Sequence, residues 1–344
     1  MLVEETPIAV PITLRTGAAQ VHRGITIVPI LSGALPQEQY ITLAEALSFG
    51  FRISEVDANG HVPELLVQNP LDKQVLLYDG EEIVGAKQNR MLEATILVAA
   101  GLTQKIPVAC VEAGRWHRTS NDFAASDRVS HHEIRRRKSR SLESAPLAFG
   151  ISQSTVWSEI DERIDEHSLV SETSALADVH EAERPRIDAI EGVFPLIDGQ
   201  CGAVLALGDT YCLDYVSRPD AWTALWPKIR RGYLLDGLRH IEDAPTASEM
   251  IARFIDNVTT APRSQRPSPG LGLGLEQRLH GDTATRRHDQ RLRARPQRRA
   301  PATLGLQPRR PERRVRRADA NQRGPSLSQA NGGGSRDAAS VGFF

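Results

Sequence analysis

The sequence of 344 residues has few cysteines and no long apolar run. Its three cysteines, Cys110, Cys201 and Cys212, form no CxxC pair, so they read as free thiols in a reducing compartment. No stretch of 18 apolar residues occurs, which argues against a membrane-spanning helix. The first fifteen residues have no basic segment followed by an apolar core, so a secretory signal is not expected. We therefore expect a cytoplasmic protein with no membrane partner.

Motifs of common nucleotide-binding and metal-dependent enzymes are also missing. GxGxxG, Walker A, GxSxG and HExxH do not occur. The adjacent His131 and His132 would project about 100° apart on a helix and would chelate one metal ion poorly. Residues 7–112 add only His22 and His61, so we expect no metal site and no cofactor. The basic run at 135–138 is interpreted as a solvated helix face, or as a loop against the acidic body of the chain.

Charge is divided unevenly along the chain, although the net charge is −1. Residues 276–344 contain 16 Arg, no Lys and 6 acidic residues, and therefore carry a charge of +10. The preceding residues carry −11, from 26 basic and 37 acidic side chains. Electrostatics alone would direct such a tail to nucleic acid or to another polyanion.

The hydrophobic pattern changes from strand-like to helical near residue 125. Residues 7–112 contain short β-branched and alternating runs, at the spacing of a sandwich or a partly closed barrel. Residues 154–167 and the segment after Pro219 have helical period, and residues 203–216 are typical of a β-hairpin. From residue 263 onward Pro, Gly, Arg, Ser and Gln dominate without periodicity, which predicts disorder.

These patterns predict an α+β fold. A β-rich, sandwich-like N-terminal half is followed by a helical insertion and a C-terminal hairpin–helix unit. We expect one globular domain at 1–262, β-rich over 1–125 and α+β over 126–262, and a disordered Arg-rich tail at 263–344.

A dense group of polar residues, GEEIVGAKQNR at 80–90, separates two of the predicted strands. Lys and Arg pair with phosphate or carboxylate, and Asn and Gln amides recognise shaped polar ligands. Glu81 and Glu82 are close enough in sequence to be salt-bridge partners of Lys87 and Arg90. The group is therefore either an anion-binding site or a satisfied ion-pair network at a sheet edge.

A second polar group, CVEAGRWH at 110–117, follows another predicted strand. Gly114 allows an unusual backbone, and Arg115 beside Trp116 can stack and hold a base or an anionic group. The alternative is a buried Trp beside a surface Arg. Cys110 has no activating base beside it in sequence, so we interpret it as a structural thiol.

Together, GEEIVGAKQNR and the later IPVACVEAGRW resemble the signature of the ARPP family, which is associated with ADP-ribosylglycohydrolases and with rhodanese/phosphatase-superfamily proteins. The run GAVLALGDTYCLDYVSRPDAWTALWPKIRRGYLLDGL at 202–238 is similar to that family's hairpin and helix. The resemblance covers roughly residues 8–282. It implies a place near ADP-ribose and nucleotide metabolism without assigning a reaction.

The resemblance also bears on the tail. Proteins of this family continue past a Ser-Pro-Gly-Leu-Gly segment, present here at 268–272, into a last strand of the domain. The Arg-, Pro- and Ala-rich residues that follow have the composition of a GC-rich gene read in the wrong frame. We hypothesise that the tail from about Thr283 is a frameshift product. The alternative is a genuine nucleic-acid-binding tail, although such tails usually mix Lys with Arg.

Three functions are consistent with these residues. The first is a domain that binds, and as an enzyme would also process, an anionic nucleotide-derived ligand such as ADP-ribose. The second is a non-catalytic interaction module whose polar groups are architectural. The third is nucleic-acid binding through the tail, if the tail is genuine. The ligand-binding candidates are Lys87, Gln88, Asn89, Arg90, Arg115 and Trp116, and the candidate general bases are Glu81, Glu82 and Glu112.

Overall fold

The computed structural model of the chain describes residues 14–31, 39–57, 59–60, 62–144, 152–260, 263–267, 270–271 and 273–277. They all belong to one compact unit, made of Met1–His280 and Asp337–Phe344. The second unit, Gly281–Arg336, contains most of the Arg-rich tail and lies outside the described residues. The frameshift and the nucleic-acid-binding tail therefore both stay hypotheses.

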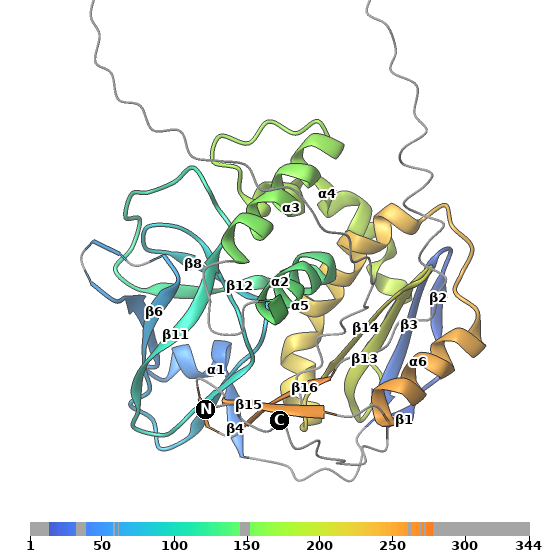
Figure 1. The fold of residues 1–344 in the computed structure, drawn as a ribbon, viewed down its shortest axis with the longest axis horizontal. Coiled ribbons are helices and arrows are strands. Elements are labelled where there is room, and N and C mark those ends of the chain that lie inside the picture. Colours follow the sequence, from blue (N-terminus) through green and yellow to red (C-terminus); the bar gives the residue numbers. More distant parts are fainter. Residues whose placement is uncertain are drawn as a thin grey trace, which may run out of the picture. The chain divides into compact units, whose positions relative to one another are not determined.

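Six antiparallel strands form the first sheet, in the order β12-β8-β9-β11-β6-β5. A β-bridge between Ser54 of β5 and Asp122, just before β12, joins the two edges of this sheet (Figure 1, left). The sheet therefore closes on itself as a small barrel, which confirms the β-rich N-terminal half. The strands are β5 (Arg52–Glu55), β6 (Glu64–Gln68), β8 (Glu81–Gly85), β9 (Arg90–Leu92), β11 (Thr103–Cys110) and β12 (Phe123–Val129).

The barrel is filled by the apolar side chains that alternation places on its inner face. A three-stranded sheet, β10-β7-β4, and helix α1 supply further side chains to the same core. These elements are β4 (Tyr40–Thr42), α1 (Leu43–Ser48), β7 (Gln74–Leu77) and β10 (Ile96–Val98). Buried residues on the inner face of the six strands are Ile53, Leu65, Val67, Ile83, Leu92, Ile106, Val108 and Phe123.

The second large sheet has the order β1-β3-β13-β14, with β2 also paired to β3 (Figure 1, right). Its strands are β1 (Arg15–Thr16), β2 (Gln20–His22), β3 (Ile25–Leu31), β13 (Gln200–Leu207) and β14 (Thr210–Tyr215). Helix α5 (Pro219–Gly237) shares a core with Leu205 of β13, whereas α6 (Ser248–Thr260) shares another with the neighbouring Val204. The two helices therefore cover opposite faces of the sheet, and the predicted hairpin–helix unit is confirmed. Helix α5 continues through Pro227 without a break.

The predicted helical insertion consists of α2 (His132–Ser144), α3 (Ser152–Glu166) and α4 (Leu176–Ile190), followed by a 3-10 turn at Glu191–Val193. A second 3-10 turn, Leu238–His240, follows α5. The basic run on α2 was interpreted as solvated, but Arg135 and Lys138 are buried and each pairs with a buried or nearly buried carboxylate. Within the described ranges, every helix is too short or too polar to span a bilayer.

Asp214 of β14 connects α2, α5 and the segment between β7 and β8 in one buried polar network. Its carboxylate accepts hydrogen bonds from Nη1 and Nη2 of Arg135 at 2.8 and 2.6 Å. The hydroxyls of Tyr78 and Tyr233 also donate to it, each at 2.6 Å. Burial alone would raise the pKa of Asp214, but Arg135 and the two hydroxyls outweigh it and hold that pKa well below its usual range. A fully buried carboxylate is thus kept ionised by its partners.

The segment expected to be disordered from residue 263 contains two paired strands, β15 (Arg263–Pro267) and β16 (Leu273–Gln277). Between them, the backbone N–H of Leu271 donates to the carbonyl of Leu97 in β10 at 2.8 Å. Backbone hydrogen bonds do not require apolar periodicity, so composition did not reveal this hairpin. The disorder prediction is wrong for these ten residues, and its remainder lies outside the described residues.

Candidate functional site

Both polar motifs come together at one end of the barrel. Strands β5, β8 and β11 end there, and β6, β9 and β12 begin there. The connections 86–89 and 111–122 lie at this mouth, together with the described residues between β5 and β6, which are 56–57, 59–60 and 62–63. Gly85 has a φ of 124°, and a Cβ at this position would collide with Oγ of Ser120. Gly85 therefore lets the 86–89 turn pack against the 111–122 segment. The mouths of β-barrels commonly hold ligands.

The first carboxylate of the motif, Glu81, lies in strand β8 and not in the turn. It accepts a hydrogen bond from the backbone N–H of Tyr78 at 3.1 Å. It also pairs with Nζ of Lys228 in α5 at 3.1 Å. Both contacts attach β8 to its surroundings, and they occupy both oxygens of Glu81.

The second carboxylate, Glu82, also lies in β8 and is also engaged. It accepts a hydrogen bond from Oγ of Ser130 at 3.0 Å and one from Nε of Arg128 at 3.4 Å. Burial raises its pKa, while Arg128 and Ser130 act in the opposite direction. Among the described residues, neither Glu81 nor Glu82 forms an ion pair with a cation of the motif. The salt bridges expected inside the motif are wrong, because the carboxylates belong to a strand that packs against β12 and α5.

Arg115, from the second motif, braces the turn of the first. Its Nε donates to both oxygens of Glu112 at 2.9 Å. Its Nη1 donates to the carbonyl of Ala86 at 3.0 Å, and its Nη2 donates to Oδ1 of Asn89 at 3.1 Å. The guanidinium is therefore fully used in holding two segments of the chain together.

Glu112 completes this brace. Besides Arg115, it accepts hydrogen bonds from the backbone N–H of Asn89 at 3.1 Å and from Oγ1 of Thr173 at 3.3 Å. Burial opposes its ionisation, but the hydrogen bonds from Arg115 and Asn89 outweigh burial and lower its pKa. A paired carboxylate with a lowered pKa is a poor general base at neutral pH. These contacts satisfy the polar groups of Asn89, Glu112 and Arg115 within the chain, and the ligand-binding and base roles expected of them stay predictions.

Arg90 differs from all of these residues. It lies opposite Ile83 in the β8–β9 pairing and alternates with Leu92, so its side chain shares the inner face of the barrel. It is 0% exposed, and its Nη1 donates to Oε1 of Gln88 at 2.9 Å. Its Nε and Nη2 have no hydrogen-bond partner, and no carboxylate of the described residues pairs with it. Burial lowers the pKa of this guanidinium, and two buried N–H groups without acceptors are costly unless something occupies them.

Lys87 and Trp116 cover Arg90 from the solvent side. The indole ring of Trp116 is 47% exposed, and its centroid lies 5.1 Å from Nζ of Lys87 and 5.9 Å from Cζ of Arg90. Nζ of Lys87 also donates to the carbonyl of Asn59 in the 56–63 connection. Trp116 is thus neither the buried tryptophan of the alternative interpretation nor a free surface residue. It is a cover held over the mouth by two cations.

Two further residues lie at this mouth: Glu55, which was not among the candidates from sequence, and Cys110, which was interpreted as a structural thiol. Glu55 ends strand β5, is buried, and has an Oε2 without a hydrogen-bond partner, while the backbone N–H of Lys87 lies 3.4 Å from its Oε1. The alternation of the strand could have identified Glu55, because Phe51, Ile53 and Glu55 lie on one face of it.

Cys110 lies opposite Arg90 and donates its thiol to Oε1 of Gln88 at 3.1 Å. Burial raises its pKa to about 11, as expected for the inert thiol inferred from sequence.

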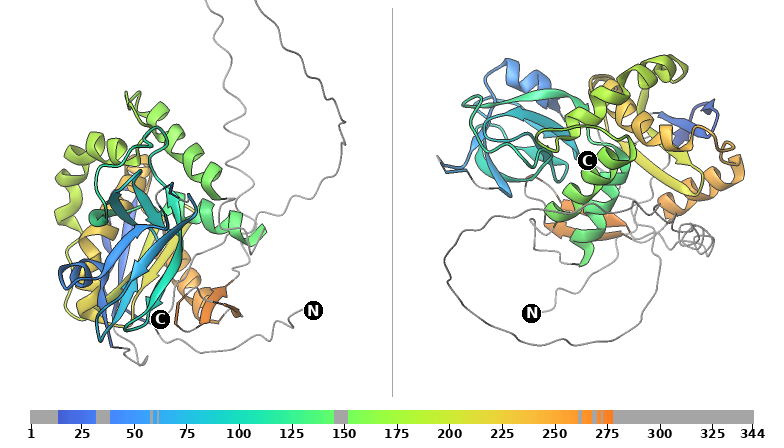
Figure 2. Two further views of the ribbon diagram at one scale, coloured as in Figure 1. Left: turned by 90° about the vertical axis from the view of Figure 1, so that its left-hand side faces the viewer. Right: turned by 90° about the horizontal axis from the view of Figure 1, so that it is seen from above.

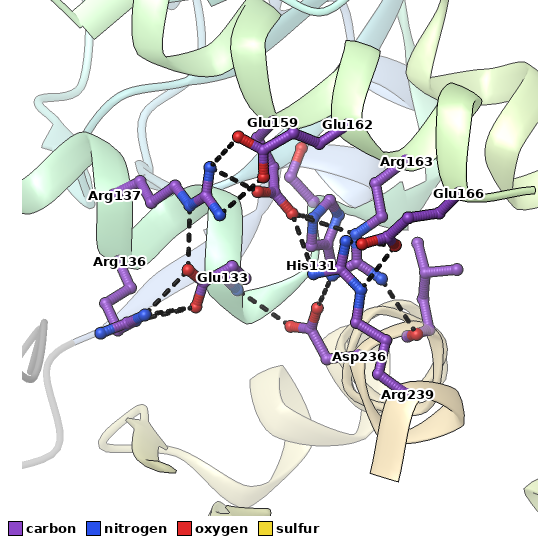
Figure 3. Close-up of polar contacts among 12 residues, drawn as sticks. His131, Glu133, Arg136, Arg137, Glu159, Glu162, Arg163, Glu166, Asp236 and Arg239 are labelled. Carbon is purple, nitrogen blue, oxygen red and sulfur yellow. Dashed lines mark hydrogen bonds and ion pairs between the residues drawn. The ribbon is translucent and has the colours of Figure 1, made fainter. Parts of the chain in front are cut away.

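A second group of charged side chains is buried between α2, α3 and α5 (Figure 3). Arg163 lies between Glu159, at 3.0 Å from its Nε, and Asp236, to which its Nη2 donates. Nε2 of His131 lies 3.2 Å from Oε1 of the same Glu159. Burial opposes ionisation of Glu159, but His131 and Arg163 bring its pKa down to about 2. Both carboxylates have cationic partners, so this group is best explained as a support for helix packing.

Two buried histidines near this support predict an acid-sensitive fold. Burial lowers the pKa of His132 to about 4, with Asp236 acting in the opposite direction, and burial also lowers the pKa of His180 far below its ordinary value. The unfolded chain binds protons near pH 6.5, so stability is complete above that pH and decreases as the pH falls toward 4. Between pH 7 and pH 5 each histidine should remove about 2 kcal/mol from the free energy of unfolding.

Urea unfolding at pH 7 and at pH 5 measures this effect, and carboxylates with a lowered pKa, such as Glu159, add little within that window because they ionise at lower pH. A His132→Gln variant should lose roughly half of the native chain's pH dependence. If the variant and the native chain showed the same difference between the two pH values, His132 would not be the titrating group.

A cavity of about 440 Å³ lies at the opposite end of the barrel, where Arg52, Gln68 and Thr103 face one another. It contains no residue of either motif. Within the described ranges, no three His, Cys, Asp or Glu side chains are grouped so that they could hold a metal ion.

The fold and site define an α+β domain with a buried, unpaired guanidinium in the mouth of a small β-barrel. Compared with models of known families, residues 13–297 match the ARG and Rhodanese-Phosphatase-superfamily-associated Protein domain, ARPP-1. The chain belongs to the ARPP-1 family, as the two motifs indicated. The matched range extends past residue 282, where the sequence resemblance was expected to stop. No curated protein and no solved structure matches the chain.

Proposed function

We propose that the barrel mouth binds the anionic group of a nucleotide-derived ligand such as ADP-ribose. One observation carries the proposal: Arg90 is fully buried with two N–H groups that no described residue accepts. Nε and Nη2 lie on one side of the guanidinium and form the fork that binds phosphate or carboxylate in a bidentate manner. Support also comes from the family name, because ARG denotes the ADP-ribosylglycohydrolases with which ARPP-1 proteins are associated.

Each residue of the mouth has a distinct task in this proposal. Arg90 takes the anion inside the barrel, and Gln88 holds Arg90 in place through its Oε1. Lys87 adds a second positive charge at the rim. Trp116 moves aside to admit the ligand and then offers its exposed ring to a base or sugar face. The Arg115–Glu112 pair keeps the turn and the 111–122 segment in register.

The alternative is a non-catalytic interaction module with an architectural polar cluster. In such a cluster each polar group should have a hydrogen-bond or ion-pair partner within the chain. Asn89, Glu112 and Arg115 fulfil that requirement, but Arg90 does not. A buried charge without an ion-pair partner lowers stability. Such a charge is therefore more often retained at a functional site than in a part of the fold that serves stability alone. Arg90 therefore favours the binding function over the architectural one.

Titration calorimetry of the full chain with ADP-ribose, NAD and inorganic phosphate tests the proposal. Charge-assisted hydrogen bonds contribute about 1.5–3 kcal/mol each, so Arg90→Gln should weaken ADP-ribose binding by about tenfold or more. Lys87→Ala should weaken it less, because Lys87 lies at the exposed rim. The Arg-rich tail is present in every variant, so its own attraction for anions cancels in the comparison.

Lys105→Ala is the matched control, since Lys105 is an exposed cation of the same sheet paired with Glu64 at 3.0 Å. Its removal should leave the affinity unchanged. Equal binding by the native chain and the Arg90→Gln variant would sink the proposed function, whatever affinity were measured.

A further inference from the structure

We propose that Glu55 is the specificity residue of this mouth, and that it selects ligands carrying hydroxyl groups next to the anion, as in a ribose phosphate. The inference rests on the proposed function, because it assigns a ligand class to the same site. Two buried side chains at this mouth lack hydrogen-bond partners of opposite kinds. Arg90 has two buried donors without acceptors, and Glu55 has a buried acceptor oxygen without a donor.

The two residues lie at the same mouth of the barrel. Glu55 is in phase with Ile53, and Arg90 is in phase with Leu92, so both side chains extend from the inner face of the barrel at the mouth. Lys87 lies beside both: its backbone N–H approaches Glu55, and its Nζ lies over the ring that also covers Arg90. Glu55 is also one of the charges that act on Arg90.

Yet the two groups do not form an ion pair with each other, nor with any other described residue. In a buried site such a pair would normally close, because an unpaired charge in a low dielectric is costly. The barrel mouth therefore holds a buried cation and a buried carboxylate, neither of which has a charged partner. A purely anionic ligand would satisfy Arg90 and be repelled by Glu55.

A ligand that satisfies both groups must present an anion to Arg90 and a hydrogen-bond donor to Glu55. Sugar hydroxyls are donors that carry no charge, and a ribose phosphate places them a few bonds from the phosphate. A carboxylate that accepts from ribose hydroxyls is also a familiar solution in nucleotide-binding folds. The geometry therefore points to a ribose phosphate as the recognised part of the ligand.

The test compares ribose 5-phosphate with methyl phosphate by titration calorimetry on the full chain. Both probes carry the same phosphate monoester, and only the first carries sugar hydroxyls. The native chain is expected to bind ribose 5-phosphate about tenfold or more tightly than methyl phosphate. Glu55→Met removes both acceptor oxygens and should bring the ratio close to one. Methyl phosphate should bind that variant at least as well as the native chain, because a repelling charge is gone.

Glu55→Gln keeps one acceptor oxygen and should recover part of the preference. Glu64→Gln, at the start of the neighbouring strand, is the matched control and should retain all of it. If Glu55→Met kept the native preference for ribose 5-phosphate, or if the native chain had no such preference, the inference would be overturned while phosphate binding itself could stand. If neither probe bound the native chain, the proposed function would fail as well.

Discussion

Replacing Asp214 by alanine is expected to lower the free energy of unfolding by about 3–5 kcal/mol. The variant leaves Arg135 buried without its bidentate partner, and it leaves the hydroxyls of Tyr78 and Tyr233 without their acceptor. Breaking one side of a buried charge pair costs more than removing both sides, because the remaining charge stays in a low dielectric. The loss is large compared with the total stability of a typical domain.

Urea unfolding of the native chain and of Asp214→Ala, followed by circular dichroism, measures this loss. Asp209→Ala is the matched control, because Asp209 is an exposed residue in the turn of the same β13–β14 hairpin. Its effect should stay within about 0.5 kcal/mol. A loss below about 1 kcal/mol for Asp214→Ala would contradict the interpretation of this network as the joint between β14, α2 and α5.

Replacing Arg90 by methionine should have the opposite effect on stability. Methionine has nearly the length of the arginine stem and carries no charge, so it can fill the same space in the barrel core. Replacing a buried ion pair by packed apolar side chains is often neutral or stabilising by about 1–4 kcal/mol, and a buried charge without a charged partner lacks even the attraction that such a pair provides. Arg90 has no ion-pair partner to lose, so we expect Arg90→Met to raise the free energy of unfolding by about 1 kcal/mol or more.

Arg115→Met provides the contrast within the same site. Arg115 is just as long and nearly as buried, but all its contacts are satisfied, so the same substitution should lower stability. The opposite signs of the two changes distinguish a residue retained for ligand binding from one retained for structure. Destabilisation of both variants to a similar extent would mean that Arg90 is part of the scaffold.

Much of the fold could be predicted from the sequence, because most of its elements have a clear hydrophobic period. The alternation at 51–56, the hairpin around Gly208-Asp209 and the helical period after Pro219 all correspond to observed elements. The spacing of the strands was consistent with a sandwich or a partly closed barrel, and it did not decide between them, since the Ser54–Asp122 bridge that closes the barrel joins residues far apart in sequence. The β15–β16 hairpin was missed because its ladder is made by the backbone.

The structure brings the two motifs together at one barrel mouth, but the roles of the individual residues could not be predicted from residue types. Both motifs do meet, since Arg115 contacts the 86–89 turn. Their sequences do not show that the N–H groups of Arg115 all have hydrogen-bond acceptors while two of those of Arg90 have none, because this depends on which atoms the fold brings close to each guanidinium. The alternation of its strand places Glu55 on the same face as apolar residues, and this could have been noticed in the sequence. That this face is the interior of a barrel could be seen only in the structure.

The most direct test of the central claim is thermal melting of the native chain and of Arg90→Met, each with and without ADP-ribose. Without ligand the variant should melt at the higher temperature. At about 100 times the dissociation constant, ADP-ribose should stabilise the native chain by about 2.7 kcal/mol and leave the variant where it was. When the ligand is added, the melting temperature of the native chain should therefore rise to that of Arg90→Met or above it. A variant that melted below the native chain without ligand, and shifted by the same amount with it, would show that Arg90 is scaffold and that the anion binds elsewhere.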